Sequence, residues 1–431
     1  MRLLPTLALS LLLAASATAE SPRTLNNDDS CDIGLAPAAT LLLPYFRVDV
    51  DDVTGENTLF TITNVNELAQ VARVTLWTDW AYPILTFDLY LTGYDVQSIS
   101  LHDVIGRGII AGTGTSVSPV GEHSEVNPRL DVTNCRHLPA RIEEPLLDHV
   151  KMALHEGVVP GCNNVGDAHE NATGYATIDV VGNCGTGRNP TDAGYFSEDI
   201  RFDNVLTGDY IQLRAHDSFA QASPMVHIRA LTEPRPRLER TFYQRFQPRA
   251  RRPRDERQPL PSTFAVRWFH GPGVDTTLQI WRDGVTSRDT ACADFDLNGN
   301  VLVAESVAFD EDENGEGIHE PEIVTLPIGD PRIVLPATSV NSAGDDDVFP
   351  QEVFDEQLSG WLYLNLDDGD DADGRGAHQN WVTARMEAEG RYSVAFDAAW
   401  LGNGCSPATG VTKFTEEGST VMPGPSPDVN P

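Results

Sequence analysis

Hydrophobic and polar residues alternate with a period of two in runs that begin near residue 40 and recur almost to the end of the chain. One run places Val74 and Leu76 on one side and Arg73 and Thr75 on the other. Successive side chains of a β-strand point to opposite faces, so each run predicts a strand with one buried and one solvated face. The same alternation occurs at 87–91, 175–181, 264–268, 362–366 and 392–396.

These runs predict a mainly β protein built from antiparallel sheets. The 431 residues suffice for two hydrophobic cores, and 35 glycines and 29 prolines supply turns between strands. We expect two antiparallel β-sandwich-like domains, with one helical, disulfide-containing insertion in the first. The expected boundaries are a loose N-terminal segment at 20–36, a first domain at 37–232, a linker or loop at 233–261, a second domain at 262–412 and a disordered tail at 413–431.

One stretch near 139–157 has a helical period instead. Its apolar residues recur every four positions, at Ile142, Leu146, Val150 and Leu154. Pro145 fits only in the first turn of a helix, and Gly157 suits a C-terminal cap. The pattern predicts one amphipathic helix that packs through this stripe.

The first residues predict export. Arg2 precedes an apolar stretch at 3–15, and Ala17-Thr18-Ala19 is a small-residue cleavage site. We therefore expect a signal peptide at 1–19 and a mature chain that starts at Glu20. No later stretch has the apolar length of a membrane-spanning helix, so the mature chain is expected in the periplasm or outside the cell.

Six cysteines in an exported chain predict disulfides. Cys292 and Cys405 are the two in the second half, and we expect them to bridge to each other. The other four are Cys31, Cys135, Cys162 and Cys184, whose pairing stays open. Zinc is the alternative, but no C-x2-C spacing occurs.

An acidic stretch has the residue spacing of a calcium-binding motif, the clearest motif in the chain. Asp294, Asp296, Asn298, Gly299 and Glu305 match the pattern D-x-[DN]-x-[DN]-G-x5-E, in which alternate oxygens converge on calcium. A second acidic cluster follows it. The candidate metal ligands are Asp294, Asp296, Asn298, Asn300, Glu305, Asp310, Asp312 and Asn314.

The flanking residues argue against a true EF-hand, which needs a helix on each side. Residues 301–303 are apolar and β-branched, as in a strand. In the alternative, Asn298-Gly299 is a hairpin turn with acids that face water. However, 292–375 holds 22 acidic residues against Arg332 and Arg375, a net charge of −20. Such crowding favours bound counter-ions, so calcium is the expected cofactor.

The formal net charge of −34 makes nucleic acid an unfavourable partner. Residues 233–258 differ, because nine arginines stand among prolines there. These are Arg235, Arg237, Arg240, Arg245, Arg249, Arg251, Arg252, Arg254 and Arg257. This segment is expected to be a linker or exposed loop; binding an anionic polymer is the functional alternative, and a solvated loop the simpler one.

No nucleophile elbow, metalloprotease motif or P-loop is present. Trp77, Trp80 and Tyr82 would suit an aromatic platform for a sugar, although burial in a core explains them better. We therefore expect a non-enzymatic surface, matrix or binding module with a polysaccharide or protein partner. The alternative is a secreted glycosidase-type hydrolase on a β scaffold, in which two carboxylates act as the catalytic pair.

Short segments in both halves resemble a family of exported bacterial proteins of unassigned function. The segments are LLLPYF at 41–46, LWTDW at 76–80, YLTGYDVQ at 90–97, RQPLPSTF at 257–264 and FDAAWLGNGC at 396–405. The resemblance implies a secreted, β-rich protein. It implies no activity and no catalytic residue.

Overall fold

A computed structural model of the chain describes 35–110, 123–135, 138, 140–161, 165–166, 168–230, 241–246, 255–261, 263–269, 274–283, 285–286, 295–296, 300–303, 305–311, 315–318, 322–325, 333–336, 359–366, 379–388, 392–397, 399–400, 413–414 and 420–421. The expected signal peptide, most of the loose N-terminal segment and most of the C-terminal tail lie outside these residues.

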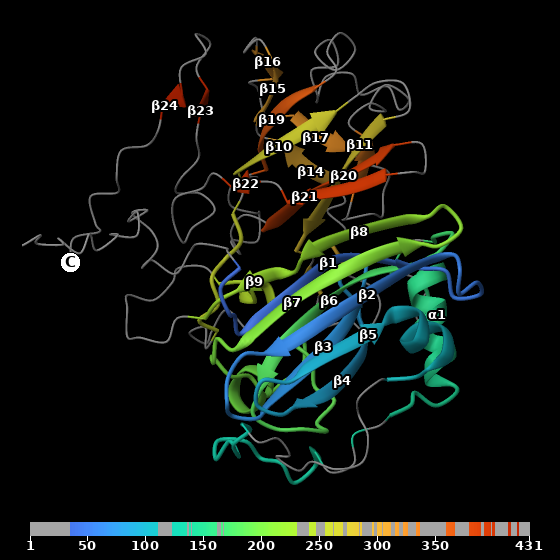
Figure 1. Cartoon of the computed structure of the whole chain (residues 1–431), viewed down its shortest axis with the longest axis vertical. Helices are drawn as coiled ribbons and strands as arrows, with labels where there is room; N and C mark the ends of the chain where they lie inside the picture. Colours follow the sequence, from blue (N-terminus) through green and yellow to red (C-terminus); the bar gives the residue numbers. More distant parts are fainter. Residues whose placement is uncertain are drawn as a thin grey trace, which may run out of the picture.

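The first half forms two antiparallel sheets (Figure 1). The five-stranded sheet has the order β4 (Pro83–Leu91), β3 (Gln70–Thr78), β6 (Ala172–Val181), β1 (Thr40–Val48) and β9 (Val226–Ile228). The four-stranded sheet has the order β5 (Val96–Ser100), β2 (Glu56–Asn64), β7 (Leu206–Arg214) and β8 (Phe219–Pro224). The prediction of a mainly β protein with antiparallel sheets is confirmed.

The second half adds two larger sheets and three strand pairs. One sheet has the order β16 (Gly315–Ile318), β15 (Glu305–Asp310), β19 (Ser359–Asn365), β10 (Thr263–Phe269) and β22 (Ala399–Trp400). The other has the order β18 (Ile333–Pro336), β11 (Val274–Arg282), β20 (Asn380–Ala388) and β21 (Tyr392–Asp397). The pairs are β12 (Val285–Thr286) with β13 (Phe295–Asp296), β14 (Asn300–Val303) with β17 (Glu322–Thr325), and β23 (Lys413–Phe414) with β24 (Thr420–Val421).

Helices are few in the part of the chain that the structure describes. They are the α-helix α1 (Leu146–Glu156), the π-helices η1 (His102–Gly106) and η3 (Tyr195–Asp199) and the 3-10 helix η4 (Gln244–Phe246). None of these has the length and apolar character needed to cross a membrane.

Two large apolar clusters form the core. One lies within the first half, where both sheets contribute: Phe60 and Tyr210 from the four-stranded sheet meet Leu41, Val74 and others from the five-stranded sheet. The other crosses between the halves, and it joins Trp77 and Tyr175 to Trp281 and Trp381. Strand β8 of the first half also runs beside β21 of the second (Figure 1). The two halves therefore pack as one body.

The one-sided burial predicted for the central strands is wrong. Every residue of β3 and β6 is buried, including Arg73 and Thr75, which the alternation places toward solvent. The face that carries Arg73 is covered by residues of 183–200, among them Asp199. A polar residue in a strand can thus face a second protein layer, which the period of two does not distinguish from water.

The helix is present but shorter than predicted. It starts at Leu146, because Pro145 occupies the N-cap and lacks the N–H that would continue the helix backward. Val150 and Leu154 of the predicted stripe are buried, whereas Leu146 is 45% exposed and its neighbour Leu147 is buried in its place. Gly157 ends the helix at φ 68°, and the predicted cap is confirmed.

The expectation of a solvated loop at 233–261 is wrong for its described residues. Phe242, Tyr243, Phe246 and Leu260 belong to the apolar cluster that joins the halves. Arg257 is fully buried, and it is the one arginine of this segment whose side chain the structure describes. These residues anchor the segment to the core.

The burial of Leu147 in place of Leu146 makes a direct prediction. Leu147→Ala leaves a cavity and should cost about 2–4 kcal/mol of the free energy of unfolding. Leu146→Ala removes the same atoms from a half-exposed site and should cost less than about 1 kcal/mol. Urea unfolding of both variants measures the difference. Equal losses would contradict the packing described for α1.

Candidate functional site

Four polar residues form a row across the five-stranded sheet. Arg73 on β3 lies opposite Asp88 on β4 and Asp179 on β6, and Asp179 lies opposite Thr40 on β1. Residues in register on adjacent strands share a face of the sheet. All four side chains are buried, so three charges lie side by side away from water.

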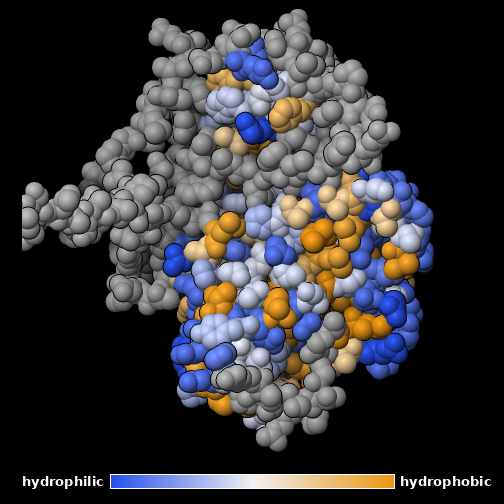
Figure 2. Space-filling view, viewed as in Figure 1, coloured by the Kyte–Doolittle hydropathy of each residue, from blue (hydrophilic) through white to orange (hydrophobic). Residues whose placement is uncertain are grey.

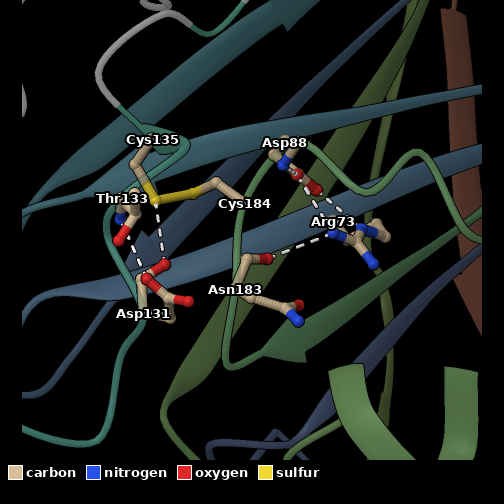
Figure 3. The surroundings of a disulfide bond; sticks show 8 residues. Arg73, Asp88, Asp131, Thr133, Cys135, Asn183 and Cys184 are labelled. Carbon is tan, nitrogen blue, oxygen red and sulfur yellow. Dashed lines mark hydrogen bonds and ion pairs between the residues drawn. A yellow bond between two sulfur atoms is a disulfide. The ribbon is translucent and has the colours of Figure 1, made fainter. Parts of the chain in front are cut away.

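Arg73 is held by a fork of acceptors. Its Nε and Nη2 donate to the two oxygens of Asp88 at 2.7 and 3.1 Å, and its Nη1 donates to Asp199 at 2.7 Å. Nη2 also donates to the carbonyl of Asn183 at 3.1 Å (Figure 3). Burial alone lowers the pKa of Arg73, but the hydrogen bond and charge of Asp88 outweigh it and raise that pKa.

Asp199 accepts hydrogen bonds on both carboxylate oxygens. Arg188 donates to it at 2.6 and 3.1 Å, Thr186 at 2.8 Å and Asn183 at 3.0 Å. Burial raises the pKa of Asp199, but the bonds from Asn183 and Thr186 and the charge of Arg73 outweigh burial, so its pKa lies below the ordinary value. Asp199 therefore stays ionised in the folded protein at neutral pH.

The Asp179 carboxylate accepts hydrogen bonds from hydroxyl groups of three segments. Thr40 and Tyr195 donate to it, and Tyr243 donates at 2.8 Å. Burial, followed by the charge of Asp179, raises the pKa of Tyr195 and of Tyr243 well above the ordinary value. Both phenols are thus fixed as donors, and they tie η3 and the 241–246 segment to the centre of the sheet.

Arg257 extends the row on the side of β1. Its Nε lies 3.6 Å from Asp179 and its Nη1 lies 3.3 Å from Asp255. Nη2 donates to the carbonyls of Ala39 at 3.2 Å and Arg201 at 3.0 Å. Burial raises the pKa of Asp255, and the charge of Arg257 counters only part of this rise.

We call this set the ionic cluster: Thr40, Arg73, Asp88, Asp179, Asp199, Asp255, Arg257, Tyr195 and Tyr243. Each carboxylate accepts bonds from the protein, so the arrangement is a closed network that joins β1, β3, β4 and β6 to two crossing segments. All four carboxylates are buried. The chemistry of the ionic cluster is that of a structural lock.

A disulfide lies next to the ionic cluster. Cys135 and Cys184 are joined, with a Cα–Cα distance of 4.9 Å, and Cys184 follows the Asn183 whose carbonyl binds Arg73 (Figure 3). No cysteine in the described part of the chain is free. Disulfides are confirmed for this pair, while Cys31, Cys162, Cys292 and Cys405 lie outside the described residues.

A second buried carboxylate is paired with a histidine. His169 Nε2 lies 2.8 Å from Asp79, which is buried at the end of β3. A carboxylate that orients a histidine is one part of a nucleophile site. Across the ranges that the structure covers, no serine, threonine or cysteine bonds to His169. The pair holds His169 beside the end of β3. Thr78 donates to the carbonyl of Val165 and holds that residue beside β3 as well.

The structure places four of the predicted metal ligands at strand ends. Asp296 ends β13, Asn300 starts β14, Glu305 starts β15 and Asp310 ends β15. Asp294, Asn298, Asp312 and Asn314 lie outside the described residues. The strand predicted at 301–303 is confirmed, so the flanks are not those of an EF-hand. Among the residues described, no three His, Cys, Asp or Glu side chains converge as metal ligands, and calcium stays a prediction.

The predicted sugar platform does not reach the surface. Trp77 is fully buried, stacks on Tyr175 at 5.6 Å and donates from Nε1 to Thr177 at 2.9 Å. Trp80 is also buried, and Tyr82 is partly buried. Trp77 therefore serves as core, because it belongs to the apolar cluster between the halves.

The ionic cluster was not found from the sequence. Its members are spread from Thr40 to Arg257, and no spacing rule joins them. One signal is present: Arg73 and Asp88 sit in adjacent predicted strands, at positions that a hairpin register would bring opposite each other. Reading charged strand positions in pairs would have suggested that one ion pair.

Comparison with protein-family models, with curated proteins and with solved structures finds no match to the chain. The resemblance drawn from the short segments therefore stays a hypothesis. Any functional conclusion has to come from the residues themselves.

The cluster predicts unequal effects for two neighbouring acids that both bind Arg188. Asp199→Asn leaves Arg73 without one of its two buried counter-charges and should cost about 3–5 kcal/mol of unfolding free energy. Glu198→Gln breaks an exposed pair and should cost less than about 1 kcal/mol. Chemical denaturation of both variants gives the comparison. A mild effect of Asp199→Asn would refute the lock.

The lowered pKa of Asp199 also predicts a pH dependence. The unfolded chain binds a proton at Asp199 more readily than the folded chain, so this residue stabilises the fold above about pH 4. That contribution is lost as pH falls below this value through the lower folded pKa. Melting temperatures measured from neutral to acidic pH should fall less steeply in Asp199→Asn than in the wild type. Parallel curves would argue against the proposed charge state.

Proposed function

We propose that the chain is an exported, non-enzymatic protein of two β-sandwich-like domains that acts as a surface, matrix or binding module. Calcium stabilises the acidic loops of its second half. The observation that carries this proposal is the position of four predicted ligands. Asp296, Asn300, Glu305 and Asp310 all lie at the ends of β-strands.

Carboxylates at neighbouring turns repel each other. The acidic stretch 292–375 carries a net charge of −20, and its described strands pair with each other across short sheets. Like charges at turns destabilise the compact state unless salt or bound cations offset them. Outside the cell, calcium is abundant enough for oxygen-rich loops with millimolar affinity.

The disulfide supports export. A bond between Cys135 and Cys184 persists in oxidising compartments and is rare in the cytosol of mesophiles. The N-terminal signal-like sequence points the same way.

The buried charges support a non-enzymatic role. Asp88, Asp179 and Asp199 are saturated by arginines and hydroxyls, as a structural network requires. A glycosidase would need two carboxylates that face a bound sugar. The shared apolar cluster of the two sheets in the first half supports the sandwich-like arrangement.

Thermal unfolding with calcium, with magnesium and with chelator tests the calcium proposal. Calcium at about 100 times the dissociation constant should add about 2.7 kcal/mol to the unfolding free energy. This corresponds to a rise in melting temperature of about 5–11 °C for a domain of 150–250 residues. Magnesium should have less effect, because it dehydrates reluctantly.

A matched pair of double variants locates the effect. Asp294→Asn with Glu305→Gln should remove most of the calcium response. Asp51→Asn with Glu67→Gln changes the same number of charges at exposed positions of the first half and should keep it. Identical melting temperatures with calcium and with chelator at low ionic strength would overturn the proposal.

A further inference from the structure

A glutamine and a threonine lie opposite each other in the second half without hydrogen-bond partners. Gln279 on β11 is in register with Thr383 on β20, and the two residues are 5% and 1% exposed. In the part of the chain that the structure describes, neither amide atom of Gln279 has a hydrogen-bond partner, and the hydroxyl of Thr383 has none either. Leaving a buried polar group unpaired costs folding free energy, so these three atoms call for an explanation.

The same two residue types lie opposite each other in the first half, with a different outcome. Thr58 on β2 is in register with Gln212 on β7. The hydroxyl of Thr58 donates to the carbonyl of Arg47 at 3.1 Å and accepts a bond from its N–H at 3.3 Å. The main chain thus fixes the hydroxyl of Thr58, whereas it leaves the hydroxyl of Thr383 available to its neighbour.

Two further residues belong to the row that Gln279 and Thr383 begin. Asp397 on β21 is in register with Thr383, on the side away from Gln279. Trp281 stands two positions beyond Gln279 and therefore shares its face of the sheet. Its indole N–H is buried and also has no hydrogen-bond partner among the described residues. The row therefore combines an amide carbon, a hydroxyl, a carboxylate residue and an N–H donor.

The spacing of a β-sheet brings the amide and the hydroxyl within reach of each other. Side chains directly opposite on adjacent antiparallel strands have Cβ atoms about 4.5–5.5 Å apart. The oxygen of Thr383 is one bond from its Cβ, and the Cδ of Gln279 is two bonds from its Cβ. Ordinary rotation about these bonds brings the two atoms into contact.

We propose that Thr383 and Gln279 react with each other to form an ester between β11 and β20. The Oγ1 of Thr383 attacks the Cδ of Gln279, a C–O bond forms, and the C–N bond breaks to release ammonia. Asp397 accepts the hydroxyl proton and passes it to the departing nitrogen. The indole N–H of Trp281 donates to the negative oxygen of the tetrahedral intermediate. Atoms and electrons balance without a second substrate.

The position of the row protects the product. Hydrophilic and hydrophobic residues are mixed over the described surface of the first half (Figure 2), but the row is an interior feature of the second half. Exclusion of water prevents hydrolysis of a reactive bond. An ester also retains no N–H, so the reaction removes the unpaired donors of the amide and of the hydroxyl together.

The ester would fasten the two ends of the acidic stretch. Residues 292–375, with their net charge of −20, lie between Gln279 and Thr383 in the sequence. Closing a long loop with a covalent bond restricts the unfolded chain. The link holds β11 against β20 whether or not cations offset the repulsion of the acids, so it is independent of the calcium proposal.

Peptide mass spectrometry of the purified full-length chain tests the proposal. After reduction of disulfides, trypsin should release the peptides 268–282 and 376–385, which contain Gln279 and Thr383. We expect them as one joined species, lighter than their sum by one ammonia, about 17 Da. Hydroxylamine, which cleaves esters, should separate them. Recovery of both peptides as separate, unmodified species from the untreated wild type overturns the proposal.

Matched variants assign the bond to its two residues. Thr383→Val removes the nucleophile without removing a described hydrogen bond, and Gln279→Glu removes the ammonia, so both should yield only separate peptides. Thr75→Val is the control, because Thr75 is also fully buried and its hydroxyl has no partner among the described residues. It should keep the joined species. A joined species that persists in Thr383→Val, or one that hydroxylamine leaves intact, contradicts the ester.

Discussion

The Asp179 carboxylate is the point on which the first half depends. It lies at the centre of a sheet, fully buried, and it is stabilised only by groups that the rest of the chain brings to it: Thr40, Tyr195, Tyr243 and Arg257. Removing the partners of a buried charge strongly destabilises the fold, because the charge is then left uncompensated away from water. The folded arrangement of η3, of 241–246 and of Arg257 is therefore specified by the need to satisfy this one group.

The same requirement links the two halves. Tyr243 donates to Asp179 through its hydroxyl, and its ring packs with Phe242 and Phe246 in the apolar cluster that reaches Trp281. The polar end of one side chain thus completes the ionic cluster, and its apolar body completes the shared core. At a second point of contact, the ring of Phe219 lies 4.5 Å from the guanidinium groups of both Arg214 and Arg385, one from each half. Strand-rich halves that look separable in sequence are joined by residues of mixed character.

Local patterns in the sequence predicted the strands and the end of the helix, which depend on neighbouring residues. The period of two found the strands around Val74 and Phe87, and Gly157 marked the end of α1, because these features follow from backbone geometry and burial of one neighbour. The ionic cluster depends on contacts between residues more than a hundred positions apart, as in Thr40 with Asp179 and Arg257 with Thr40. Alternation places Arg73 toward solvent, and the Arg- and Pro-rich composition of 233–258 does the same for Arg257, since neither signal contains information about a second layer. The calcium ligands are an intermediate case, in which the strand ends were foreseen and the binding itself stays a prediction.

The shared apolar cluster has a spectroscopic consequence. It holds Trp77, Trp268, Trp281 and Trp381, four of the seven tryptophans, at the place where the halves meet. The emission of these four tryptophans therefore reports on the apolar cluster that the halves share. Separation of the halves would wet these indoles and shift their emission to the red, even if every strand stayed paired. The emission maximum thus reports whether the two halves are packed together, whereas circular dichroism reports the content of β-strand.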